Sequence, residues 1–255
     1  MVNLDLPLWL TSPWVVGLVL NSLLAVLAIL IPKKLLTPAG LAHAWGLGVL
    51  VWGTLGWRGY VIVLFYFLVG SAVTKVGLEQ KQAKGIAEKR DGARGPENVW
   101  GSALTGAICG LLTVITPETW LPYLTLAYVA SFSTKLSDTT SSEIGKAYGK
   151  RTFLITTFQP VPPGTEGAVS LEGTLAGLGA AWLISFLGSG LGLVSWWGVG
   201  LCVLAALIAN YVESLIGAKW QENYAWLTNE VVNGINTTVG AMLAVAGGLV
   251  IKFWS

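Results

Sequence analysis

The side chains best suited to chemistry lie between Ser131 and Thr152, in the block SFSTKLSDTTSSEIGKAYGKRT. If this block is helical, Asp138 and Glu143 lie within about a turn of each other and offer carboxylate oxygens to Mg²⁺. The lysines of the block offer positive charge to phosphates, and they are Lys135, Lys146 and Lys150. Carboxylates, a divalent cation and lysines are what phosphoryl transfer requires, because the protein must position phosphates and neutralise their charge. The alternative is a surface helix that carries several ion pairs.

A second polar segment, Thr74–Ser102, contains the run GARGPEN, which places Arg94 and Asn98 beside glycines. The glycines free the backbone there, so the guanidinium and the amide suit the capture of an oxyanion. The residues before this run can be helical, with Glu88 on one face. The alternative is a solvated basic loop that is attracted to anionic lipid headgroups.

A third polar segment, Thr152–Thr174, begins with strand-like alternation and continues into a run rich in proline and glycine. This pattern predicts a short β-hairpin whose turn holds Gly164, Thr165 and Glu166. An acidic residue at the membrane surface of an otherwise apolar chain is a candidate functional residue. The alternative is a solvated turn, which does not account for Glu166.

The fourth polar region carries amide and carboxylate groups near the ends of two expected spans. Asn210, Glu213 and Ser214 recur at helical spacing, and Asn229 and Asn233 follow at i and i+4. These side chains either join neighbouring helices by hydrogen bonds or line a polar pocket shared with the block around Asp138.

These polar segments interrupt a chain that is otherwise apolar. Of 255 residues, 54% are hydrophobic and 11% are charged, and the mean hydropathy is +0.67. Lipid offers no partners to backbone amides, so apolar runs of about 20 residues become spanning helices. We therefore expect an all-α polytopic integral membrane protein, a single transmembrane domain over residues 1–255 with about seven or eight helices. The expected spans are 14–31, 41–57, 59–74, 99–116, 120–135, 172–187, 196–211 and 234–253.

The second and third expected spans are short and separated only by Arg58, so they form a tight helical hairpin or include a re-entrant segment. Positive charge predicts the orientation of the chain. With the N-terminus outside, only Arg58 and Lys252 of the 15 basic residues lie on the outer side. The basic residues expected inside are Lys33, Lys34, Lys75, Lys81, Lys84, Lys89, Arg90, Arg94, Lys135, Lys146, Lys150, Arg151 and Lys219.

Composition also excludes several classes of function. A net charge of +2 does not indicate binding to nucleic acid, so none is expected as a partner. The single histidine, His43, excludes a zinc site built on several histidines. The expected partners are membrane lipids, an isoprenoid phosphate lipid and a nucleoside triphosphate, and the oligomeric state is left open.

Five blocks resemble the phytyl-phosphate kinase family of plants and cyanobacteria, which includes transmembrane proteins of unassigned function. These blocks are GIAEKRDGARGPENVWGS, SDTTSSEIGKAYGK, PPGTEGAVSLEGT, NYVESLIGA and TNEVVNGINT. The resemblance extends over nearly the whole chain, and the residues from Asp138 to Gly145 are its most specific part. More distantly, the arrangement is similar to CTP-dependent phytol and dolichol kinases and to CDP-diacylglycerol synthases.

The resemblance implies a phosphotransferase with a phosphate group as acceptor, which transfers a phosphoryl group from a nucleoside triphosphate to phytyl monophosphate. CTP is the expected donor, Mg²⁺ the expected cofactor, and phytyl diphosphate the product used for tocopherol and phylloquinone. The implied catalytic residues are Asp138, Glu143 and Lys135, and the implied metal ligands are Asp138, Glu143, Glu166 and Glu213. The implied nucleotide- and phosphate-binding residues are Lys146, Lys150, Arg94, Asn98, Glu88, Gly145, Gly164, Thr165, Asn210, Ser214, Asn229 and Asn233.

Three other functions compete with this interpretation: a polyprenol or phytol kinase that uses CTP, a cytidylyltransferase that releases pyrophosphate, and a transporter. A transporter would favour polar residues at the midplane and an internal repeat, whereas these polar residues gather at one surface. The apolar tail of a lipid phosphate suits a lateral groove between helices, because the tail then stays in lipid. We expect the active site on the cytoplasmic or stromal side of either a plasma or a thylakoid membrane.

Overall fold

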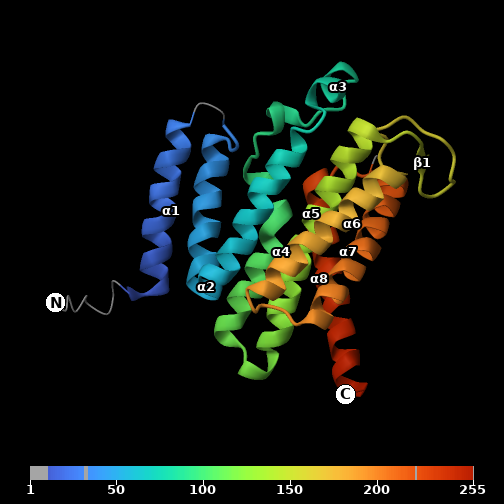
Figure 1. Ribbon diagram of the computed structural model, residues 1–255. Coiled ribbons are helices and arrows are strands. Elements are labelled where there is room, and N and C mark those ends of the chain that lie inside the picture. Colours follow the sequence, from blue (N-terminus) through green and yellow to red (C-terminus); the bar gives the residue numbers. More distant parts are fainter. Residues whose placement is uncertain (1–10, 32–33, 222, 255) are drawn as a thin grey trace.

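The computed structural model describes residues 11–31, 34–221 and 223–254, so the inner-side prediction for Lys33 lies outside the described residues. Long helices dominate the molecule (Figure 1), and this confirms the predicted class of an all-α multi-pass membrane protein. The α-helices are α1 (Pro13–Leu30), α2 (Pro38–Thr74), α3 (Leu78–Ala83), α4 (Pro96–Ile115), α5 (Leu121–Tyr148), α6 (Leu171–Gly190), α7 (Trp196–Ile216) and α8 (Asn229–Trp254). The short elements are the 3₁₀ helices η2 (Lys89–Gly92) and η3 (Glu118–Trp120), the π-helical turn η4 (Gly217–Gln221), and the strands β1 (Thr152–Leu154) and β2 (Ala168–Ser170).

Side-chain caps set where several helices begin. The Thr37 hydroxyl accepts the Gly40 N–H at 3.0 Å, and Pro38 occupies the first helical position of α2, where no N–H is needed. The Ser170 hydroxyl accepts the Gly173 N–H at 3.1 Å at the start of α6. Ser170 is also the last residue of β2, so this cap joins the small sheet directly to a spanning helix.

The central helix, α5, differs from the helices around it. Within the described residues, six helices are long and apolar enough to cross a membrane, and they are α1, α2, α4, α6, α7 and α8. Polar residues interrupt α5, yet it packs against α2, α4, α6, α7 and α8. Its side chains Val129, Phe132 and Leu136 are fully buried. Helix α5 therefore crosses the bundle as a core element whose polar residues face protein rather than lipid.

The 37-residue element α2 contains two antiparallel helical halves rather than one rod. Its backbone leaves the helical region at Gly56, with φ 62° and ψ −161°, values that only glycine adopts without strain. The rings of Trp52 and Tyr60 then meet at 5.2 Å between centroids, and Figure 1 shows the chain reversing direction there. The two spans expected at 41–57 and 59–74 thus form a helical hairpin.

Glycines on three neighbouring helices bring α5 into close contact with its surroundings. A Cβ atom on Gly177 of α6 would overlap the Ser141 hydroxyl, and one on Gly240 of α8 would overlap that of Thr134. On α4, a Cβ atom on Gly106 would lie 2.5 Å from the ring of Phe132. Small residues at these positions let the helix backbones approach closely, and helix packing in lipid depends on such close approach.

The polar connections gather at one end of the bundle. Strands β1 and β2 pair antiparallel with Thr152 opposite Ser170, which confirms the predicted hairpin. Figure 1 shows β1 and α3 at the same end of the molecule, whereas α1 begins and α8 ends at the opposite end. The segments richest in charge therefore lie together on one side of the bundle.

Candidate functional site

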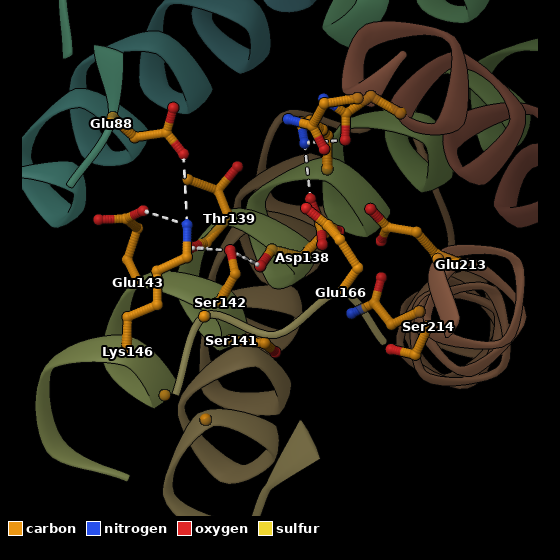
Figure 2. A pocket seen from close by; sticks show the side chains of 18 of the residues that line it. Glu88, Asp138, Thr139, Ser141, Ser142, Glu143, Lys146, Glu166, Glu213 and Ser214 are labelled. Atoms are coloured by element: carbon orange, nitrogen blue, oxygen red, sulfur yellow. Dashed lines mark hydrogen bonds and ion pairs between the residues drawn. The ribbon is translucent and has the colours of Figure 1, made fainter. Parts of the chain in front are cut away.

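A polar cavity of about 1020 Å³ lies at the end of the bundle that carries α3 and the hairpin. Residues from α4, α5, α7 and α8 line it, together with the loop before α4 and the turn between β1 and β2. Figure 2 shows carboxylate, hydroxyl and ammonium groups that converge on this space from separate elements. Residues distant in sequence therefore share one chemical environment.

Lys135 is the central cation of the cavity. Its ammonium group donates to Asp138 Oδ2 at 2.6 Å, one helical turn along α5, and to Asn233 Oδ1 of α8 at 2.7 Å. Both bonds are charge-assisted because the ammonium group is positively charged. The side chain is almost completely buried, so the bonds are also shielded from bulk water. Lys135 thereby links the polar parts of α5 and α8.

Three carboxylates line the cavity on the side of this lysine. Asp138 of α5 lies next to Glu213 of α7, and Glu166 from the hairpin turn lines the same part of the cavity (Figure 2). Figure 2 shows Asp138, Glu166 and Glu213 pointing into the same space. Asn236 of α8 donates to Glu213 Oε2 at 2.8 Å and fixes that side chain. Together these groups form an acidic cluster on one side of the cavity.

An amide network supports this acidic cluster. Asn236 also donates to Asn210 Oδ1 at 3.3 Å, and Asn210 donates to the Ser137 hydroxyl at 2.9 Å. The network runs from α8 through α7 to α5. The predicted amide side chains therefore have both predicted roles, hydrogen bonding between helices and lining of the polar pocket. They join helices, and they line the cavity through Asn210 and Asn233.

Lys146 lies on the other side of the cavity, about two helical turns from Asp138. Its ammonium group is 3.5 Å from Glu88 Oε1 and 3.7 Å from Glu143 Oε1. Glu143 also forms an ion pair with Lys81 of α3, and the side chains of this pair are 2% and 0% exposed. A buried pair of this kind holds α3 onto α5 and leaves Lys146 facing the cavity (Figure 2).

The structure separates Glu143 from Asp138, although both were expected to bind one metal ion. Five residues along a helix rotate a side chain by about 140°, so the two carboxylates leave α5 in different directions. The carboxylate of Glu143 is engaged by two lysines instead. Glu213 of α7 is the acidic neighbour of Asp138.

The loop before α4 supplies two arginines, and the first turn of α4 supplies an amide. The Asn98 Oδ1 atom accepts the Gly95 N–H at 3.0 Å and caps α4, and it also accepts from Arg90 at 2.9 Å. Arg94 donates to the Tyr66 hydroxyl at 2.9 Å, and its guanidinium lies over the Tyr66 ring at 5.0 Å. The predicted oxyanion segment thus borders the cavity with two guanidinium groups.

Most of the predicted site residues line this cavity. The lining includes Gly145, Gly164, Thr165, Ser214 and Asn229 in addition to the residues described above. The Thr165 hydroxyl donates to the Pro162 carbonyl at 2.8 Å, and Gly164 has φ 90°, so both residues shape the turn that carries Glu166.

Lys150 is the predicted site residue that does not line the cavity. Helix α5 ends at Tyr148, so the helical register that would align Lys150 with Lys146 no longer holds. Its side chain is exposed beyond the end of the helix.

The sequence prediction omitted several residues that complete the site. Lys81 pairs with a residue 62 positions away, and no local spacing reveals such a contact. Tyr66 lies within an expected span and resembles any buried aromatic residue until Arg94 is placed against it. Arg90 bonds Glu97 and Asn98. Its position next to the GARGPEN run is the sequence feature that could have indicated its place in the site.

The donor set suits Mg²⁺ bound together with phosphates. Among the described residues, no three acidic, histidine or cysteine side chains form a ready metal-binding group. Mg²⁺ is commonly held by one or two carboxylates plus substrate phosphates and water, and Asp138 with Glu213 provides such a pair. Acidic side chains also outnumber basic ones around the cavity. The acidic residues are Glu88, Glu97, Asp138, Glu143, Glu166, Glu213 and Glu230, and the basic residues are Arg90, Arg94, Lys135 and Lys146.

Comparison with known proteins extends over most of the chain. Residues 21–241 match the profile of a family described as integral membrane protein DUF92. An uncharacterized membrane protein of Synechocystis is 63% identical over 92% of both chains. The chloroplastic protein VTE6 of Arabidopsis thaliana is 49% identical over 82% of this chain and 64% of its own length. A membrane protein of Methanocaldococcus jannaschii is 34% identical over 88% of this chain and 90% of its own. No solved structure matches.

Proposed function

Because the chain belongs to the DUF92 family of integral membrane proteins, we propose that it is a lipid kinase embedded in the membrane. It transfers the terminal phosphoryl group of a nucleoside triphosphate, with CTP as the preferred donor, to phytyl monophosphate. The products are phytyl diphosphate, a precursor for tocopherol and phylloquinone, and a nucleoside diphosphate. The sequence blocks that resemble the phytyl-phosphate kinase family support this proposal, and the similarity to the chloroplastic protein VTE6 is consistent with it.

The polar cavity is the observation that carries the proposal. It has room for several phosphate groups, and its lining combines cations with an excess of carboxylates. Bare phosphates would be repelled by so many acidic groups, whereas phosphates accompanied by Mg²⁺ would not. This charge balance supports the use of a nucleotide bound with Mg²⁺.

The residues of the cavity have distinct roles in the proposed reaction. Asp138 and Glu213 would hold Mg²⁺, which when bound neutralises phosphate charge and orients the transferred group. Lys135, kept in place by Asn233, fixes the position of Asp138 and adds positive charge beside it. Lys146 faces the cavity and can bind the phosphates of the nucleotide, and the guanidinium of Arg90 adds positive charge on the α4 side.

The reaction needs no general base. An oxygen of the acceptor phosphate is already deprotonated at neutral pH and attacks the terminal phosphorus atom of the donor. The bond from that phosphorus atom to the bridging oxygen breaks, and the electron pair leaves with the nucleoside diphosphate. Both reactants are anions, so neutralisation of charge and alignment dominate the rate.

We propose that this cavity opens on the cytoplasmic or stromal side, where nucleotides are present. The basic loops expected inside include the segments around Lys81, Arg94 and Lys146, and these segments border the cavity end of the bundle. An acceptor lipid in the same leaflet then reaches the cavity without leaving the membrane.

The test is to incubate purified protein with phytyl phosphate, Mg²⁺ and each nucleoside triphosphate, and to identify both products. Phytyl diphosphate with CDP supports the proposal, whereas pyrophosphate with a cytidylyl lipid indicates a cytidylyltransferase. Phosphorylation of free phytol but not of phytyl phosphate would indicate a polyprenol-type kinase. Uptake of substrate into proteoliposomes without any product would indicate a transporter.

A further inference from the structure

A second cavity lies beside the polar one and has the opposite character. It is a groove of about 750 Å³ between α1, α2 and α4. Apolar side chains make up most of its lining, among them Leu24, Leu27, Leu47, Val63 and Phe67. The exposed positions of α1 show that this helix is only loosely covered by the rest of the protein, so the groove borders lipid.

The two cavities meet at four residues. Tyr66, Arg94, Asn98 and Ser102 line both of them. A molecule with a charged head and an apolar tail could therefore occupy both spaces at once. Such continuity is what distinguishes this groove from an ordinary gap between helices in lipid.

Of these four residues, Arg94 alone carries a cationic side chain. Its guanidinium packs on the rings of Tyr66 and Phe67, at 5.0 Å and 5.7 Å, and donates to the Tyr66 hydroxyl. A Cβ atom on Gly70 would lie 2.7 Å from its Nη2 atom, so glycine there makes room for the group. Among the described residues no carboxylate lies within ion-pair distance of Arg94, in contrast to Lys135 and Lys146.

We propose that the groove binds the isoprenoid tail of the acceptor lipid and that Arg94 binds its phosphate. The proposal rests on the proposed kinase function and assigns the acceptor to the α1, α2 and α4 side of the site. The nucleotide then occupies the opposite side, around Asp138 and Lys146. A guanidinium suits this position because its planar fork binds two phosphate oxygens and its face stacks on aromatic rings.

The floor of the groove sets the length of tail that it accepts. The Tyr60 hydroxyl donates to Asn21 Oδ1 at 2.9 Å, and Gly48 leaves the space that the Asn21 side chain occupies. From Asn21 to Ile31 the groove follows α1 for about 15 Å at the helical rise of 1.5 Å per residue. This is about half of a hydrocarbon core of about 30 Å, so a longer chain must bend or leave sideways into lipid.

A groove-filling substitution tests the assignment. Ala28 of α1 lines the groove, whereas Ala42 of α2 is exposed outside it, so Ala28→Trp and Ala42→Trp are a matched pair. We expect Ala28→Trp to lower kcat/KM for phytyl phosphate about tenfold or more and to change that for dimethylallyl phosphate less than twofold. Ala42→Trp should leave both values unchanged. Equal effects of Ala28→Trp on the two acceptors, or no effect on either, would overturn the assignment.

A second variant tests the phosphate site. Arg94→Gln should raise KM for both acceptors about tenfold and leave KM for the nucleotide within twofold, and Arg94→Lys should recover part of the loss. A rise in KM for the nucleotide alone would show that Arg94 belongs to the donor side. Binding of a photoreactive isoprenoid phosphate without nucleotide separates this inference from the kinase function. If the probe labels α1 and Ala28→Trp abolishes that labelling, binding of the tail in the groove is supported even if no kinase activity is found. If Ala28→Trp leaves the labelling unchanged, tail binding in the groove is refuted.

Discussion

Replacement of Asp138 by asparagine is the most direct test of the proposed site. The substitution keeps the size of the side chain and removes its negative charge. The new amide oxygen can still accept the hydrogen bond from Lys135, whose length in the native protein is 2.6 Å. A hydrogen bond to a charged group contributes about 1.5–3 kcal/mol and a neutral one about 0.5–1.5 kcal/mol, so the bond weakens by about 1 kcal/mol. Glu213 stays close to Lys135 in the variant, so the buried lysine keeps an acidic neighbour.

The expected result is a folded protein that has lost its activity. Loss of one positioned polar group from a preorganised site commonly lowers kcat by about 10²–10³, and loss of a metal-binding carboxylate should be at least as severe. The assay is the initial rate of diphosphate formation from phytyl phosphate and CTP in detergent or proteoliposomes. Thermal unfolding followed by tryptophan fluorescence reports on the fold.

The matched control is Glu118→Gln. Glu118 is exposed on η3, at the end of α4 remote from the cavity, and its loss should leave the rate within twofold of the native rate. Native-like turnover by Asp138→Asn would refute the assignment of this carboxylate to the proposed Mg²⁺ site. A large fall in thermal stability of that variant would contradict the energetic argument above.

Three further predictions concern the scaffold. Lys81→Met leaves Glu143 buried without its main partner. It should lower the free energy of unfolding, measured by chemical denaturation, by about 3–5 kcal/mol. A change below about 1 kcal/mol would show that the pair is dispensable. Gly177→Val inserts carbon atoms against Ser141 and should destabilise by at least about 1–3 kcal/mol, measured as a lower melting temperature; an unchanged value would contradict the close packing of α5 and α6. Gly56→Ala forces φ 62° on a residue with a Cβ atom and should cost about 1–3 kcal/mol while sparing kcat, and a selective loss of kcat would argue against a purely structural turn.

Much of the architecture could be predicted because a bilayer sorts residues strongly. The charge-poor runs fall on long helices, six of which in the described part of the chain could cross a membrane, and the alternation after Thr152 predicted the small sheet. Helical periodicity also placed Lys135 and Asp138 on one face of α5 and aligned the amides of α7 and α8. These features depend on local spacing, which a sequence displays directly.

The rest depends on which helices become neighbours. The contact between Lys81 and Glu143 arises only when α3 folds over the end of α5, so the spacing of Glu143 from Asp138 suggested a shared metal ion instead. The reversal of α2 falls at Gly56 rather than at Arg58, because the turn needs a positive φ and not a charge. The choice of Glu213 as neighbour of Asp138 likewise follows from the packing of α7 against α5.

The close glycine contacts of α5 limit how this helix can move. Helices on three sides touch its backbone or its short side chains, so α5 cannot tilt or slide without breaking several contacts together. Lys135 and Asp138 are therefore held in fixed positions in the cavity. We therefore expect any widening of the cavity to come from the elements around α5, such as α3 or the turn that carries Glu166.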